Sequence, residues 1–192
     1  MTNSDFVPTD DLSTIREMDE HVVHPWESFD RPNTSRTIID SGAGVYVYDD
    51  QGNRLLDGPG GMWCVNVGHG RQEIADAIAD QAAQLSYTSP WSHPTAPAAR
   101  LADRLSSVAP GDLDHVFYTT GGSTAIDSAL RFCLFYNNVL GRPEKKQFIT
   151  RHDAYHGSTY LSAAVCGKSR DKNWLDTQLD QEIGRASCRE RV

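Results

Sequence analysis

The order of the elements in the second half of the sequence predicts an α/β fold. A strand-like run at His115–Tyr118 leads into the polar stretch TTGGST, and a helix-like run follows over Ala125–Asn137. A second strand-like run, KKQFIT, comes next, so strand, helix and strand follow one another as in a βαβ unit. The chain has 192 residues and is 39% hydrophobic, which is enough for one domain with a real core.

Composition excludes several classes of protein. The formal net charge of −8 argues against nucleic acid as the main partner, since phosphate backbones need clustered Lys and Arg. No apolar run approaches the roughly 20 residues of a membrane span, and the polar, acidic start has no signal-peptide core. We therefore expect a cytoplasmic protein. The four cysteines are far apart without CxxC spacing, so neither disulfides nor a zinc site are expected.

The first half of the chain predicts a short helix and then strands. Asp11–His21 has an amphipathic pattern, and Arg36–Gly58 alternates apolar and polar residues around DDQGN, which indicates a β-hairpin or meander with Gly52 in the turn. Gly58–Gly70 is rich in glycine and indicates a loop with little regular structure.

Helices are predicted on both sides of the next loop. Over Arg71–Leu85 the apolar residues Ile74 and Ile78 fall on one face at helical spacing. A second helix is expected over Ala98–Val108. The long helix that begins at Ala125 is expected to close at Gly141.

The stretch YTTGGSTAID at Tyr118–Asp127 is a candidate phosphate site. A helix N-terminus presents unpaired N–H groups and partial positive charge, and glycines 121 and 122 let a phosphate approach the backbone. The Ser123 hydroxyl adds a donor. The loop matches neither a Walker loop nor GxGxxG, so a nucleotide is not indicated. The alternative is a tight turn capped by Ser123 or Thr124.

The segment RHDAYHGSTY follows the second strand, at the edge where α/β folds bind ligands. The ring of Tyr155 could stack on a flat cofactor, beside His156 and Gly157. The alternative is an aromatic residue packed on the sheet. His152 and His156 are four apart, but HExxH is absent and no third ligand is evident, so a metal site is not expected.

Aromatic residues in two further loops suit a pocket wall or a dimer interface. Trp63 lies in GGMWCVN, and SYTSPW adds Tyr87 and Trp91. The alternative for each is an ordinary core or interface position.

Together these pieces resemble the class III aminotransferases, pyridoxal-phosphate enzymes of fold type I. The matching text is GVYVYDDQGNRLLDGPGGMWCVNVGHG, then VFYTTGGSTAID, then GRPEKKQFITRHDAYHGST, and the resemblance covers roughly residues 19–166. Within the family the text is most similar to the ω-amino acid–pyruvate transaminases, including the taurine and β-alanine enzymes.

The resemblance implies a role for each candidate residue. Gly121, Gly122 and Ser123 hold the phosphate of pyridoxal 5'-phosphate, and Tyr155 stacks on its ring with His156 and Gly157 beside it. Trp63, Tyr87 and Trp91 shape the substrate pocket. The resemblance also implies a homodimer when the protein is full length, an amino donor and a keto-acid acceptor.

The family's Schiff-base lysine lies downstream of the YHG block, and none of the lysines here has its sequence context. We therefore expect an N-terminal fragment that is inactive alone: residues 1–57 as the helix and meander of the small domain, and residues 58–181 as part of the large domain and its sheet. Back-translated, residues 182–192 resemble a sequencing adapter, so we expect them to be non-native. The alternatives are another pyridoxal-phosphate enzyme of the same fold (an aminomutase, epimerase or decarboxylase) or a non-catalytic module that binds a phosphate ligand.

Overall fold

The structure is a computed structural model that describes residues 12–25, 27, 36–168 and 183–186. The chain divides into two units, Met1–His93 and Pro94–Val192. The predicted division at residues 57 and 58 concerns the domains of an intact enzyme, and it stays a prediction.

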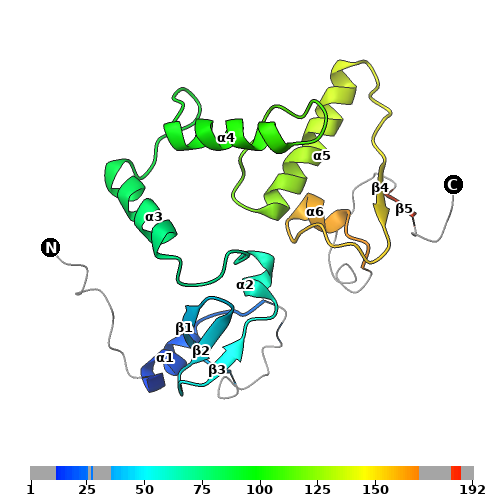
Figure 1. Ribbon diagram of the computed structural model, residues 1–192. Coiled ribbons are helices and arrows are strands. Elements are labelled where there is room, and N and C mark those ends of the chain that lie inside the picture. Colours follow the sequence, from blue (N-terminus) through cyan, green and yellow to red (C-terminus); the bar gives the residue numbers. More distant parts are fainter. Residues whose placement is uncertain (1–11, 26, 28–35, 169–182, 187–192) are drawn as a thin grey trace. The chain divides into compact units, whose positions relative to one another are not determined.

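An antiparallel sheet of three strands organises the first unit (Figure 1). Its strands are β1 (Ile39–Ala43), β2 (Tyr46–Asp49) and β3 (Arg54–Leu56), and they pair in chain order. Gly52 in the turn between β2 and β3 has φ +79°, a backbone conformation that suits glycine. The predicted meander is confirmed.

The register of β2 and β3 places Tyr46 opposite Leu56 and Tyr48 opposite Arg54. The Arg54 guanidinium lies over the Tyr46 ring, 4.6 Å from its centroid. This cation–π contact joins the two strands at one end of the hairpin.

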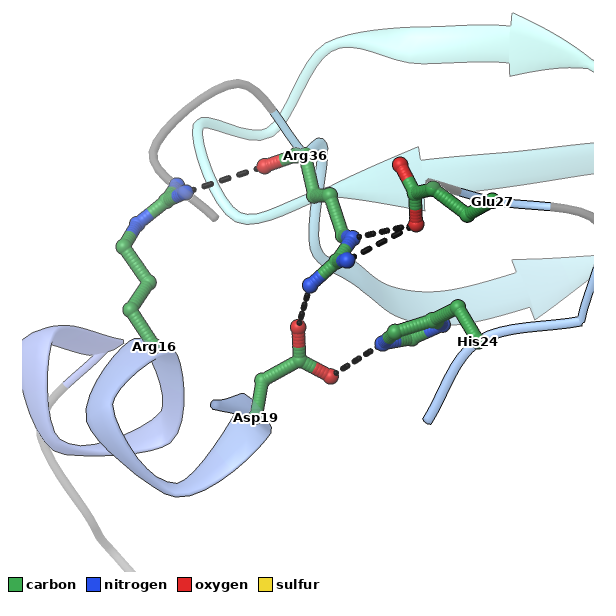
Figure 2. A network of polar contacts seen from close by, with 5 residues as sticks. All are labelled: Arg16, Asp19, His24, Glu27 and Arg36. Carbon is green, nitrogen blue, oxygen red and sulfur yellow. Dashed lines mark hydrogen bonds and ion pairs between the residues drawn. The ribbon is translucent and has the colours of Figure 1, made fainter. Parts of the chain in front are cut away.

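Ion pairs join helix α1 (Leu12–Asp19) to the segment that leads into the sheet (Figure 2). The Arg36 guanidinium donates to Glu27 Oε2 over 2.7 and 3.0 Å and to Asp19 Oδ2 over 2.9 Å. His24 Nε2 lies 2.8 Å from the other Asp19 oxygen, and Arg16 donates to the Arg36 carbonyl over 2.9 Å. Hydrogen bonds from His24 first and Arg36 second hold the pKa of Asp19 below its ordinary value of 3.8.

Two further helices follow the sheet in the first unit. One turn, α2 (Gly60–Trp63), lies within the segment that was predicted to be irregular, and α3 (Gln72–Gln84) confirms the predicted helix. No residue of α3 is buried, and Ile78 on its apolar face is 64% exposed. The helical pattern is present, but the described part of this chain does not cover that face.

The second unit contains three helices and a pair of parallel strands in its described part. The helices are α4 (Ala96–Val108), α5 (Gly122–Val139) and α6 (Tyr160–Ala164). Helix α5 ends just before Gly141, which has φ +69°, as the sequence predicted. Helix α5 packs on α6 (Figure 1).

The predicted strand at His115–Tyr118 is wrong for this structure. A strand needs a hydrogen-bonded neighbour, and none pairs with this segment among the described residues. Phe117 instead packs edge-on against Phe132 of α5, with ring centroids 5.2 Å apart. The Tyr118 hydroxyl donates to the Ala98 carbonyl of α4 over 2.7 Å. Side-chain contacts thus hold the segment where a strand ladder was expected.

The other predicted strand is present as β4 (Phe148–Arg151), which pairs in parallel with β5 (Ile183–Ala186). Strand β5 falls in residues 182–192, the segment predicted to be non-native. A strand ladder uses backbone groups, so pairing does not test where a sequence came from. That origin stays a prediction.

Among the described residues, the buried side chains gather around α6. They are Thr150, Ser162, Ala163, Ala164, Val165 and Cys166. Small side chains dominate this set, so backbone segments can approach closely here. This is also where the glycine-rich start of α5 and the segment after β4 come together.

Candidate functional site

Helix α5 begins at Gly122, three residues before the predicted start, so Ser123 and Thr124 lie in its first turn. Gly121 is the N-cap and no side chain caps the helix. The hydroxyls of Thr119 and Thr124 both donate to the Gly121 carbonyl, over 3.1 and 2.8 Å. The predicted alternative, a cap by Ser123 or Thr124, is therefore wrong. The N–H groups of the first turn have no preceding helical carbonyl to bond.

Open space lies beside both glycines at this helix end. A Cβ atom built on Gly121 or Gly122 would meet no atom within 4 Å. Any side chain at these positions would fill the space that a ligand needs to reach the backbone N–H groups. The geometry therefore fits a phosphate at the start of α5.

The segment after β4 packs directly on this helix end. The Ser158 N–H donates to Ser123 Oγ over 3.1 Å, across 35 residues of sequence. A Cβ atom at Gly157 would lie 2.5 Å from Ser123 Oγ and 2.8 Å from Ser123 Cα. Only glycine allows this approach, and φ +140° at Gly157 also disfavours other residues. Because its oxygen accepts from Ser158, the Ser123 hydroxyl keeps its hydrogen to donate.

His156 and Tyr155 differ in their surroundings. His156 Nε2 lies 3.0 Å from the Thr150 hydroxyl of β4, and the His156 N–H donates to Cys166 Sγ over 3.2 Å. The Tyr155 side chain is 52% exposed. The structure thus brings Ser123 and Gly157 together, holds His156 against β4, and leaves half of the Tyr155 surface accessible.

Two residues to which the sequence analysis gave no role complete the contact. The Asp127 carboxylate of α5 accepts the Ser162 N–H over 2.8 Å, and Ser162 is fully buried. Its hydroxyl would lie 2.5 Å from a Cβ at Gly157. The available signal was spacing, since Asp127 is four residues after Ser123 and so shares its helix face. Ser162 carried no such signal.

The three predicted substrate residues belong to the first unit, and the cofactor residues belong to the second. Trp63, Tyr87 and Trp91 are all exposed, and Trp63 is the last residue of α2. Trp63 has φ 67°, in the left-handed region that costs a non-glycine residue about 1–2 kcal/mol. Their role in a pocket stays a prediction.

In the part of the chain that the structure describes, His, Cys, Asp and Glu side chains nowhere gather in threes in a way that could hold a metal ion. The helices of the described ranges include none with the length and apolar character to cross a membrane.

Comparisons with known proteins agree on one family. Residues 29–188 match the aminotransferase class-III family. The chain is 38% identical over 179 residues to an uncharacterized aminotransferase of Sinorhizobium fredii (strain NBRC 101917 / NGR234), a match that covers 90% of this chain and 38% of the relative. It is also 38% identical over 152 residues to the putrescine–pyruvate aminotransferase of Pseudomonas aeruginosa, covering 77% and 33%.

A solved structure gives the same result. The omega transaminase from Pseudomonas jessenii in complex with PMP superposes with a TM-score of 0.85 at 32% identity, covering 91% of this chain and 39% of that one. The fold is therefore the α/β fold of fold-type-I transaminases. The chain spans less than two fifths of the length of each of these three proteins.

Proposed function

The chain belongs to the class-III aminotransferases, a family of pyridoxal-phosphate-dependent transaminases. From that membership we propose that it forms the cofactor-holding part of an enzyme that moves an amino group from an ω-amino acid or amine to pyruvate or another keto acid. The observation that carries the proposal is the Ser158–Ser123 hydrogen bond, which joins the start of α5 to the Tyr155–Gly157 segment.

In this proposal the start of α5 binds the phosphate of pyridoxal 5'-phosphate. The N–H groups of its first turn and the Ser123 hydroxyl donate to phosphate oxygens, and the helix end supplies partial positive charge. The ring of Tyr155 would stack on the pyridine ring. When bound, the cofactor supplies an electron sink for the carbon that carries the amino group.

The substrate assignment rests on similarity. The Pseudomonas aeruginosa relative is named for putrescine and pyruvate, so a terminal amine as donor and pyruvate as acceptor fit the proposal. Taurine and β-alanine remain donors to test. Trp63, Tyr87 and Trp91 would supply apolar walls for the chain of such a donor. We also propose a homodimer for the intact enzyme, located in the cytoplasm.

Binding of pyridoxal phosphate to the 192-residue chain tests the phosphate site. We expect a saturable change in cofactor absorbance that inorganic phosphate competes away. Ser123→Ala should weaken binding about 5- to 10-fold, because it removes the Ser123 hydrogen bond to the phosphate, worth roughly 1 kcal/mol, and also the acceptor of the Ser158 N–H. Ser107→Ala is the matched control, since its hydroxyl bonds the Arg104 carbonyl of its own helix, α4. Equal effects of the two variants would contradict the proposal.

We further propose that this chain alone does not transaminate. Lys145, Lys146, Lys168 and Lys172 lack the family context of the lysine that attaches the cofactor. The measurement is amino transfer from putrescine, taurine or β-alanine to pyruvate, followed as alanine formed. Alanine above the cofactor-only rate would contradict this part, and the product identity would separate transamination from mutase, epimerase or decarboxylase chemistry.

A further inference from the structure

Helix α2 is a single turn with a left-handed backbone. The φ angles are 55° at Gly60, 59° at Gly61, 64° at Met62 and 67° at Trp63. Hydrogen bonds of helical spacing close it, from Trp63 N–H to the Pro59 carbonyl over 2.8 Å among them. Glycine accepts this conformation freely, but Met62 and Trp63 do not. Strain of this kind persists only where surrounding contacts impose it.

The Asp57 carboxylate contacts the backbone of this turn. Its oxygens accept the Gly61 N–H, at 3.1 Å to Oδ2 and 3.3 Å to Oδ1. His69 Nε2 lies 2.9 Å from the same Oδ2, and because a carboxylate accepts, this ring nitrogen carries the hydrogen. The Asp57 side chain is 11% exposed, so these partners replace most of its water. Its pKa lies below the ordinary value, first because of His69 and then because of the backbone N–H of Gly61.

His69 is itself fixed to the sheet. Its N–H donates to the Gly44 carbonyl over 2.8 Å, and the Gly44 N–H donates back over 3.0 Å. Its ring lies on the backbone of Gly42 in β1, where a Cβ atom would come within 2.7 Å of the ring. A continuous path of contacts therefore runs from β1 through His69 and Asp57 to the turn that ends at Trp63.

We infer that Asp57 and His69 are positioning residues, which hold the left-handed turn and so aim the Trp63 ring at the apolar part of an amine substrate. The claim that Trp63 is aimed at a substrate rests on the proposed function. The claim that Asp57 and His69 hold the turn does not depend on it. Neither Asp57 nor His69 touches the substrate in this inference, and both act through the backbone of residues 60–63.

A second aspartate shows what ordinary turn capping looks like in the same unit. Asp49 accepts the N–H groups of Gln51 and Asn53 in the β2–β3 turn, over 3.0 and 2.7 Å. There Gly52 takes the positive φ at no cost. At α2 the carboxylate instead accepts the Gly61 N–H, and the next two positive φ angles fall on Met62 and Trp63, which are not glycine. Loss of the carboxylate should therefore let the Trp63 side chain move.

The test is ¹⁹F NMR on the whole chain labelled with 5-fluorotryptophan. Trp63→Phe assigns the Trp63 resonance by deleting it. In Asp57→Ala and His69→Ala we expect that resonance to move toward the shift of free 5-fluorotryptophan, while the Trp91 resonance stays in place. Asp57→Asn, which keeps one acceptor, should give a smaller shift. Adding Met62→Gly to Asp57→Ala should bring the resonance part of the way back, since glycine accepts the left-handed backbone.

Asp49→Ala is the matched control and should leave the Trp63 resonance unchanged. An unmoved resonance in Asp57→Ala, an equal shift in Asp49→Ala, or no return with Met62→Gly would each overturn the inference. The measurement needs neither cofactor nor amine. A failure here therefore leaves the cofactor-binding test of the proposed function untouched, and the reverse is also true.

Discussion

The two units hold their polar contacts by different physical means. Around Arg36 in the first unit, long charged side chains join α1 to the segment before the sheet (Figure 2). Around Ser123 in the second unit, glycine and small side chains bring two backbone segments so close that no Cβ fits at Gly157. The Arg36 ion pairs can adjust to a substitution by movement of solvent-exposed side chains. The contact between Gly157 and Ser123 can adjust only if the backbone moves.

Because of this difference, we expect the two sets of contacts to respond to different perturbations. Partly exposed ion pairs are screened by salt and change with pH, but they tolerate altered side-chain size. A close backbone contact is indifferent to salt and is broken by a single added methyl group. The predictions that follow test this contrast.

The largest effect is expected from Gly157→Ala. The new Cβ would lie 2.5 Å from both Ser123 Oγ and Ser162 Oγ, at φ +140°. We expect a loss of roughly 3 kcal/mol in the free energy of unfolding, from overpacking together with an unfavourable backbone. Urea unfolding followed by circular dichroism measures it, and cofactor binding should weaken in parallel.

Gly141→Ala is the matched control for that variant. Gly141 also has positive φ, +69°, but a Cβ there would meet nothing within 4 Å. It should lose about 1 kcal/mol, the cost of the backbone conformation alone. Equal losses in the two variants would show that close packing at Gly157 contributes nothing.

A smaller effect is expected from Asp127→Ala. The variant leaves the buried Ser162 N–H without its acceptor, which should cost about 1–2 kcal/mol of unfolding free energy. Asp127→Asn keeps an acceptor oxygen and should recover most of that stability. The same urea titration measures both, and an asparagine variant as unstable as the alanine variant would point to the charge of Asp127 instead.

The smallest effect is expected from the ion pairs of the first unit. Because the pKa of Asp19 is lower folded than unfolded, its ionised form stabilises the fold above the ordinary pKa. This contribution is lost as pH falls through the lowered folded pKa, below 3.8. We expect Asp19→Asn to flatten the acid side of the stability profile, and 1 M NaCl to mimic part of that change. Acid titration followed by circular dichroism measures it, and identical profiles for both proteins would contradict it.

Sequence patterns succeeded where the information was local. Alternation around the Gly52 turn predicted the meander, and helical spacing predicted α3 and the long helix α5. The strand prediction at His115–Tyr118 was wrong, because a strand needs a hydrogen-bonded neighbouring strand and the local sequence does not reveal whether one is present. Helix α5 begins at Gly122, three residues before the predicted start, and the Ala125 N–H donates to the Gly121 carbonyl over 3.0 Å.

The candidate site divides in the same way. The start of α5 could be predicted as a phosphate site from Gly121, Gly122 and Ser123, because a glycine pair before a helix carries its chemistry in consecutive residues. That Ser158 and Ser162 meet this helix end depends on contacts across 35 residues.

The sequence by itself determined the long helices α3, α4 and α5, the meander and the family. Each of these follows from the order and spacing of residues that are close together in the sequence. Tertiary structure alone decided that Gly157 must be glycine against Ser123, that Asp127 holds Ser162, and that Asp57 and His69 hold a left-handed turn at Trp63. The physical reason is that steric exclusion and buried hydrogen bonds depend on which distant segments meet, and that is fixed by packing.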